Sequence, residues 1–117
     1  MADVLALVDD LFFQSKMAET AKHVGVSLQT VPSGDLLVSA AAASAPRLVV
    51  IDLNARQGAL DAIGKLRAAG NPAPVIAFLS HVQTELAQQA QAAGCNQVLP
   101  RSRFTATLAE ILGTAKT

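Results

Sequence analysis

Five short stretches rich in apolar residues recur along the chain, and longer amphipathic segments separate them. The apolar runs cover residues 4–8, 26–31, 48–52, 75–79 and 97–99. Runs of this length that stay apolar without alternation are typical of strands covered on both faces of a sheet. The pattern therefore predicts five strands, and the four over 4–8, 48–52, 75–79 and 97–99 are expected to be buried.

The segments between these runs have the three- and four-residue spacing of helices. In the segment Leu11–Val24 the apolar stripe includes Phe13, Met17 and Ala21, and Gly25 follows as a typical helix end. Further helices are predicted from the Pro32–Gly34 turn to Pro46, from about Ala59 to Ala69, from Ser80 to Gly94, and after Ser102. Ser80 opens a capping-box pattern, and Ser102 stands where it can cap the last helix.

Strict alternation of strands and helices predicts right-handed crossovers and a parallel sheet. We therefore expect an α/β fold, a doubly wound five-stranded parallel sheet, formed by residues 1–117 as a single domain. Hydrophobic residues make up 51% of the chain and charged residues 15%, which favours a well-filled core over disorder.

The charge balance and the apolar lengths exclude several classes of partner. Nine basic and nine acidic side chains cancel, and no Lys/Arg run is present, so direct nucleic-acid binding is not expected. The apolar runs are far shorter than a membrane span, and the N-terminus lacks a signal-peptide pattern. We expect a cytoplasmic protein without membrane insertion. Cys95 has no second cysteine to pair with, so we assign it no chemistry.

Polar side chains follow four of the five predicted strands. Asp9 and Asp10 follow the first run, Asp52 ends the third, Ser80 follows the fourth, and Arg101 follows the fifth. The carboxyl ends of parallel strands share one edge of a sheet, where open α/β folds build their sites. The spacing therefore predicts one shared pocket.

In their order and spacing, these residues resemble the receiver domain of two-component response regulators, a flavodoxin-like (βα)5 fold of about this length. The stretches Leu-Ala-Leu-Val-Asp-Asp and Ala-Ala-Gly-Cys-Asn-Gln-Val-Leu-Pro are also receiver-like, and the resemblance covers the whole chain. It implies that Asp52 accepts a phosphoryl group from a histidine kinase or a phosphotransfer domain. The signal would then pass to a downstream protein by protein–protein interaction. The chain would not be an enzyme, apart from assisting its own phosphorylation and dephosphorylation.

The resemblance also implies a Mg²⁺ cofactor, because this ion prefers oxygen ligands and keeps several waters. Asp10 and Asp52 are the expected direct ligands, Asp9 would act through water, and the backbone carbonyl of Asn54 would complete the protein's contribution. Ser80 and the positive charge at Arg101 would contact the phosphoryl group.

Several positions depart from the receiver pattern. Arg101 stands where lysine is usual, Ser102 replaces a proline, and Val98 replaces an aromatic switch residue. The loop 54–58 is altered, and its Arg56 could fold over the carboxylates in place of a metal ion or remain a solvated loop residue. These departures support an alternative function, a pseudo-receiver that binds partners constitutively without phosphorylation.

Simpler interpretations stay open for single residues. Asp10 and Ser80 could each serve only as a helix cap, and Asp52 could be a turn residue. His81 is either a loop residue or a shield for a phosphoryl group. A flavodoxin-like or nucleotide-binding enzyme is disfavoured, because the chain lacks a glycine-rich phosphate loop.

Phe12 and Phe13 are adjacent in the first predicted helix, so both cannot face the core fully. An exposed phenylalanine beside the acidic pocket suits the docking of a partner helix. We therefore predict a partner-binding role for this pair. The alternative is that Phe13 packs inward and Phe12 lies flat over the loop.

Overall fold

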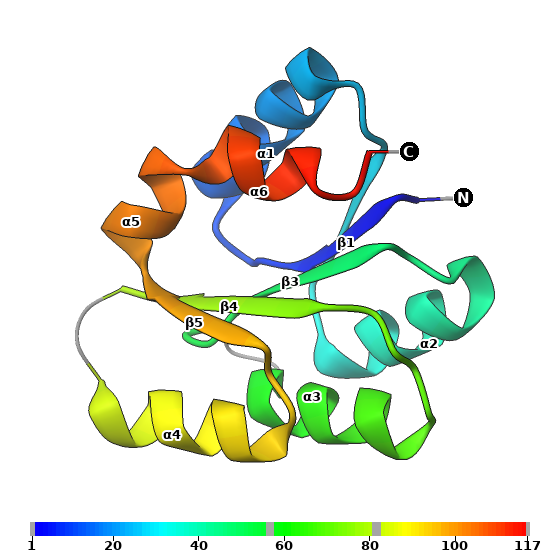
Figure 1. The fold of residues 1–117 in the computed structure, drawn as a ribbon, viewed down its shortest axis with the longest axis vertical. Coiled ribbons are helices and arrows are strands. Elements are labelled where there is room, and N and C mark those ends of the chain that lie inside the picture. The colour runs from blue at the N-terminus through cyan, green and yellow to red at the C-terminus, as the bar shows by residue number, and fades with distance from the viewer. Residues whose placement is uncertain (1, 56–57, 81–82, 117) are drawn as a thin grey trace.

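A computed structural model describes residues 2–55, 58–80 and 83–116 of the chain (Figure 1). The described strands form one parallel sheet in the order β2-β1-β3-β4-β5. Their bounds are Val4–Leu7 for β1, Leu28–Val31 for β2, Leu48–Asp52 for β3, Val75–Leu79 for β4 and Gln97–Pro100 for β5. The predicted doubly wound five-stranded parallel sheet is confirmed.

Helices cover both faces of this sheet (Figure 1). Helices α1, α5 and α6 lie on one side, and α2, α3 and α4 lie on the other. Their bounds are Leu11–Val24 for α1, Gly34–Ser44 for α2, Ala59–Ala68 for α3, Thr84–Ala93 for α4, Arg101–Ala106 for α5 and Leu108–Gly113 for α6. Among these described elements, none is long and apolar enough to cross a membrane.

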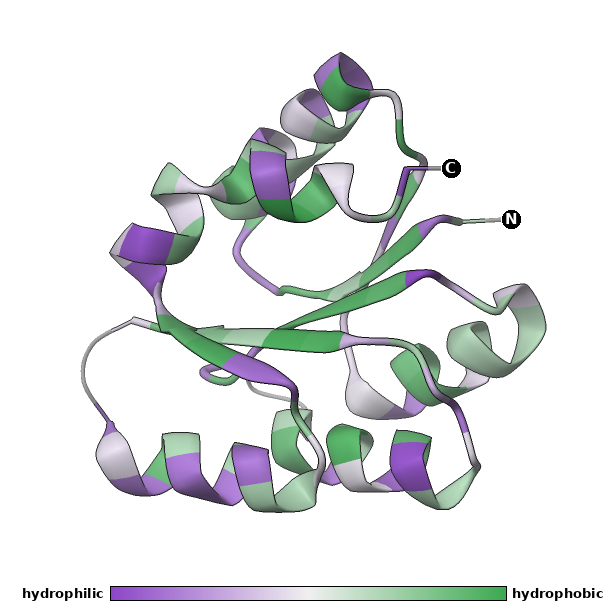
Figure 2. Ribbon diagram, viewed as in Figure 1, coloured by the Kyte–Doolittle hydropathy of each residue, from purple (hydrophilic) through white to green (hydrophobic). Residues whose placement is uncertain are grey.

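Strands β1, β3 and β4 are mostly hydrophobic, as their green colour in Figure 2 shows. All residues of β1 and β3 are buried, which explains why these segments read as continuous apolar runs. Alternate strand residues face two separate core clusters, one against α2, α3 and α4 and one against α1, α5 and α6. The sheet therefore holds the strand ends on a rigid support.

The strand register brings the carboxyl ends together. Leu7 of β1 lies beside Ile51 of β3, and the next residue, Asp52, lies beside Phe78 of β4. Phe78 lies in turn beside Leu99 of β5. The residues that follow β1, β3, β4 and β5 therefore emerge at one edge of the sheet.

Two predicted helix starts are wrong. Helix α4 begins at Thr84 and not at Ser80, because the Ser80 N–H and hydroxyl both donate to Asn54 Oδ1. The last helix begins at Arg101 directly after Pro100, so Ser102 lies inside it and does not cap it.

The last helix is also split into α5 and α6 at Thr107, which has φ −110° and ψ 14°. The hydroxyls of Thr105 and Thr107 donate to the carbonyls of Arg101 and Arg103, four residues earlier. Side chains that bond to the backbone in this way tend to bend helices. The sequence pattern predicted a single helix here, and this prediction is wrong.

Candidate functional site

The polar residues at the strand ends lie together, and we call Asp9, Asp10, Asp52, Ser80 and Arg101 the strand-end site. Asp10 forms an ion pair with Arg101 at the carboxyl ends of the strands. The charges of Asp9, Asp10 and Arg101 act electrostatically on Asp52. Asn54 connects the loop after β3 to Ser80. These contacts bring the predicted residues to one edge of the sheet, and their roles in a shared pocket stay predictions.

Asp52 is the buried carboxylate of this site, with 6% of its surface exposed. One of its oxygens, Oδ1, accepts a hydrogen bond from the Asn54 N–H at 2.9 Å. Burial raises the pKa of Asp52, and the repulsion from Asp9 and Asp10 adds to the rise. The Asn54 hydrogen bond and the Arg101 charge oppose it. Asp52 is therefore a poorly solvated carboxylate at the end of a rigid strand.

Asp10 uses both of its oxygens within the protein. Oδ1 accepts from the N–H groups of Phe12 and Phe13 at 3.0 and 3.3 Å, which makes Asp10 the N-cap of α1. Oδ2 accepts from Arg101 Nη2 at 2.9 Å. The Phe13 N–H and then Arg101 hold the pKa of Asp10 below its ordinary value. Asp10 therefore caps α1 and also forms an ion pair, so it is not only a helix cap.

Arg101 lies between Asp10 and a group of phenylalanines. Its guanidinium carbon is 4.6 Å from the centre of the Phe13 ring and 5.8 Å from that of Phe78. Phe78 stacks on Phe104 with ring centres 4.5 Å apart. A planar guanidinium is well suited to an aromatic face. The rings and the carboxylate together define where the Arg101 charge sits.

The side chain of Asn54 was not predicted to have a role, yet it joins two loops. Its Oδ1 accepts from the Ser80 N–H at 2.7 Å and from the Ser80 hydroxyl at 3.0 Å. Its Nδ2 donates to Gln83 Oε1 at 2.9 Å. The partners are 26 and 29 residues apart in sequence, and no local pattern signals such a contact.

Mg²⁺ suits the donor chemistry of the strand-end site but not its present arrangement. Asp9, Asp10 and Asp52 offer carboxylate oxygens, the donors that this ion prefers. Within the described residues, however, no group of three acidic, histidine or cysteine side chains is placed to hold a metal ion. A cation bound to Asp10 would have to compete with Arg101 for Oδ2 of that carboxylate.

Phe12 and Phe13 have opposite environments at the start of α1. Phe12 is 91% exposed, and its neighbour Leu11 is 76% exposed. Phe13 is 7% exposed and packs against Phe78 and Phe104. The prediction that Phe13 takes part in a binding surface is therefore wrong, because its ring belongs to the core. Phe12 stays a predicted contact residue.

Arg56 and His81 lie outside the residues that the structure describes. The hypotheses that Arg56 covers the carboxylates and that His81 shields a phosphoryl group therefore stay predictions.

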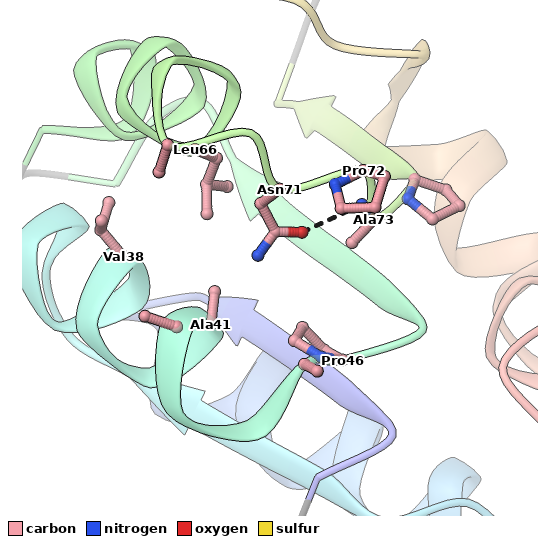
Figure 3. Close-up of a pocket in the computed structure, with 11 residues that line it drawn as sticks. Val38, Ala41, Pro46, Leu66, Asn71, Pro72 and Ala73 are labelled. Atoms are coloured by element: carbon pink, nitrogen blue, oxygen red, sulfur yellow. Dashed lines mark hydrogen bonds between the residues drawn. The ribbon is translucent and has the colours of Figure 1, made fainter.

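A separate cavity of about 500 Å³ lies at the opposite edge of the sheet, between the ends of α2 and α3 (Figure 3). It contains none of the predicted site residues and no charged side chain. It is lined by Val38, Ala41, Ala42, Ala45, Pro46, Leu66, Ala69, Asn71, Pro72, Ala73 and Pro74. This cavity therefore offers mainly apolar contacts, with the Asn71 side chain as a polar group.

Comparison with solved structures finds 287 similar chains. The signal receiver domain of the response regulator NarL from Mycobacterium tuberculosis superposes with a TM-score of 0.82 at 17% identity, over 98% of this chain and 96% of that one. The chemotaxis protein CheY4 from Vibrio cholerae gives a TM-score of 0.80 at 19% identity, over 95% and 98% of the two chains. The chain has the receiver-domain fold.

A response regulator from Burkholderia pseudomallei, solved with a phosphorylated aspartic acid, a calcium ion and citrate, matches the same receiver-domain fold. Its TM-score is 0.82 at 18% identity, over 96% of this chain and 66% of that one. No family model matches the sequence, and no curated protein matches it. At such low identity these similarities establish the fold alone, and the chemistry has to follow from the residues of the strand-end site.

Proposed function

We propose that the chain is a signal-transduction receiver that accepts a phosphoryl group on Asp52. The observation that carries this proposal is the position of Asp52, a nearly buried carboxylate at the end of β3 beside Asp9, Asp10 and Arg101. A carboxylate of this kind can act as a nucleophile when nearby charges compensate the incoming phosphoryl group. The Burkholderia pseudomallei relative was solved with a phosphorylated aspartic acid and a calcium ion.

In the proposed reaction an oxygen of Asp52 forms a bond to phosphorus, and the nitrogen–phosphorus bond of a phosphohistidine breaks. The released imidazole takes up a proton, and Asp52 becomes an acyl phosphate. Because Oδ1 already accepts from the Asn54 N–H, we assign the attack to Oδ2. A Mg²⁺ ion held by Asp10, Asp52, water on Asp9 and the Asn54 carbonyl would compensate charge in the transition state.

Ser80 provides the conformational response in this proposal. Its hydroxyl and its N–H both donate to Asn54 Oδ1, in the loop that follows Asp52. New phosphoryl oxygens on Asp52 would compete for the hydroxyl. Transfer of this hydrogen bond would draw Ser80 away from Asn54 and toward Asp52, and that movement is the proposed signal.

The proposed partners are a histidine kinase or a phosphotransfer protein on the input side and a further protein on the output side. Leu11 and Phe12 present exposed apolar side chains directly beside Asp10. Such residues often anchor protein interfaces. In this proposal the chain catalyses no reaction other than its own phosphorylation and dephosphorylation, and the cytoplasmic location stays a prediction.

The pairing of Asp10 with Arg101 favours a second candidate function, the constitutive pseudo-receiver. Both Asp10 oxygens are engaged within the protein, and the described residues do not form a metal centre as they stand. A site that is neutralised by its own arginine could bind partners in one fixed state.

Mass spectrometry after incubation with acetyl phosphate and Mg²⁺ distinguishes the two functions. We expect the wild-type chain to gain one phosphoryl group and Asp52→Asn to gain none. Asp35→Asn is the matched control, because Asp35 is an exposed carboxylate paired with Lys65 on α3, and it should behave as wild type. An unmodified wild-type chain would support the pseudo-receiver, and a modified Asp52→Asn chain would refute the choice of acceptor.

A further inference from the structure

Arg101 makes two different contacts with the beginning of α1. Its Nη2 donates to Asp10 Oδ2 at 2.9 Å, and its guanidinium carbon lies 4.6 Å from the centre of the Phe13 ring. The side chains of Arg101 and Asp10 are 32% and 39% exposed. The ion pair is therefore partly shielded from solvent, and one side of the guanidinium rests on a buried ring.

This arrangement depends on the chemistry of arginine. A guanidinium is planar and weakly hydrated, so it can stack on an aromatic face and donate sideways to a carboxylate at the same time. An ammonium group is compact and strongly hydrated, and it gains less from the ring. Phe13 is held in turn by Phe78 and Phe104, with ring centres at 5.0 and 5.9 Å. The position of the charge is thus fixed by the core.

The same contacts engage both oxygens of Asp10. Oδ1 accepts from two backbone N–H groups of α1, and Oδ2 accepts from Arg101. The positive charge of Arg101 also acts on Asp52. A divalent cation that enters this site would compete with the guanidinium for Oδ2 and would be repelled by the positive charge of Arg101 nearby.

We propose that Arg101 is a built-in counter-cation that competes with a divalent cation for Asp10, and that Phe13 is the positioning residue that keeps it there. This inference rests on the proposed function, because it concerns the same strand-end site. When the cation binds, Arg101 leaves Asp10 and becomes available to a phosphoryl group on Asp52. The exchange links the start of α1 to the junction of β5 and α5.

Titration of the folded chain with Mg²⁺, followed by backbone amide NMR, tests this competition without any phosphorylation. We expect Arg101→Ala to bind Mg²⁺ about tenfold more tightly than wild type, because a charge-assisted partner of Asp10 is lost. Arg103→Ala is the matched control, since it removes an equal charge from an exposed position on the same helix. Its affinity should stay within about twofold of wild type, because an exposed charge is screened by salt.

Phe13→Leu tests the positioning role. The variant keeps Arg101 and Asp10 but removes the aromatic face, so Mg²⁺ affinity should rise to a value between those of wild type and Arg101→Ala. Arg101→Lys should behave similarly, because lysine keeps the charge and loses the planar stack. A Phe13 side chain with a purely structural role would lower the melting temperature and leave the Mg²⁺ affinity unchanged.

Two results would overturn the inference. One is equal Mg²⁺ affinity in wild type, Arg101→Ala and Arg103→Ala. The other is the absence of saturable binding in all of these folded proteins. The proposed function fails separately, through an Asp52 that is not phosphorylated in the mass measurement. A chain could show the Mg²⁺ competition without phosphorylation, or phosphorylation without the competition, so the two failures are distinguishable.

Discussion

Asp52 combines a nearly buried side chain with a single strong backbone donor. It is 6% exposed, and Asn54 donates to its Oδ1 at 2.9 Å. Burial raises the pKa of this carboxyl above its ordinary value of 3.8. The folded chain therefore keeps the Asp52 proton to higher pH than the unfolded chain does. Ionisation of Asp52 costs folding free energy as the pH rises through the folded pKa.

Replacement of Asp52 by Asn should therefore stabilise the fold in a pH-dependent manner. The amide keeps an acceptor for the Asn54 N–H and removes the poorly solvated charge. We expect a gain on the order of 1 kcal/mol at about pH 7, and no gain below the ordinary pKa of 3.8, where both states are protonated. Urea unfolding at the two pH values measures it. An equal gain in unfolding free energy at both pH values would show that the charge of Asp52 is not the cause of the stabilisation.

The sequence predicted which residues of the strand-end site meet, but not how they pair. Asp10, Asp52 and Arg101 were predictable because each stands at the end of an apolar run. The pairing of Asp10 with Arg101 joins residues 91 positions apart, and it depends on the stacking of Arg101 over Phe13. Tertiary packing decides which of several possible partners a side chain pairs with. A local sequence pattern contains no information about that packing.

At the scale of elements, the start of α1 places two neighbouring phenylalanines in opposite environments. Phe12→Ala should change the free energy of unfolding by no more than about 0.5 kcal/mol, because Phe12 is 91% exposed. Phe13→Ala should cost about 3–5 kcal/mol, because it removes a buried ring that packs against both Phe78 and Phe104. Chemical denaturation of the pair measures both values.

Equal losses in the free energy of unfolding for Phe12→Ala and Phe13→Ala would contradict the difference in burial between the two side chains. If Phe12 also anchors a partner, Phe12→Ala should weaken that binding while the fold stays intact. Unchanged affinity for a cognate kinase or phosphotransfer protein would remove Phe12 from the interface.

The junction of α4 and β5 is held by Arg67 from α3. Its guanidinium donates to the carbonyls of Gly94, Asn71 and Ala73 and to Asn96 Oδ1, at 2.8–3.0 Å. Gly94 has φ 115°, and a Cβ at this position would lie 2.5 Å from Arg67 Cγ. The arginine cannot easily move aside, because its far end is fixed by these hydrogen bonds.

Gly94→Ala should therefore destabilise the fold by about 2–4 kcal/mol, through backbone strain and the contact with Arg67. Gly70→Ala is the matched control, because Gly70 has φ 76° and open space around it. Backbone strain alone should cost about 1 kcal/mol there. Thermal unfolding of both variants checks the difference, and similar losses would show that the Arg67 contact is unimportant.

The sequence predicted the C-terminal ends of helices correctly where a glycine follows the helix. It predicted helix starts wrongly where a serine was expected to act as the N-cap. Gly25 and Gly94 end α1 and α4 with φ 81° and 115°, as their positions in the sequence indicated. Ser80 fits a capping pattern, yet its hydroxyl bonds to Asn54 on another loop. Positive φ is a local property of glycine, whereas a hydroxyl can choose between local and distant acceptors.

At the scale of the whole molecule, the sheet separates two chemically different edges. The carboxyl ends of the strands carry the acidic residues and Arg101, and the opposite edge carries the uncharged cavity between α2 and α3. The alternation of apolar runs predicted this fold, because burial on both faces dictates the composition of parallel strands. The function proposed for the first edge requires that a change at Asp52 reaches Ser80, Arg101 and α1.

Backbone amide NMR with Mg²⁺ and then beryllofluoride, a mimic of the phosphoryl group on aspartate, tests this requirement most directly. We predict saturable shifts around Asp10, Asp52, Ser80 and Arg101, and none in Asp52→Asn. Absence of shifts in a well-folded wild-type sample would contradict phosphoryl acceptance at Asp52 and support a constitutive pseudo-receiver.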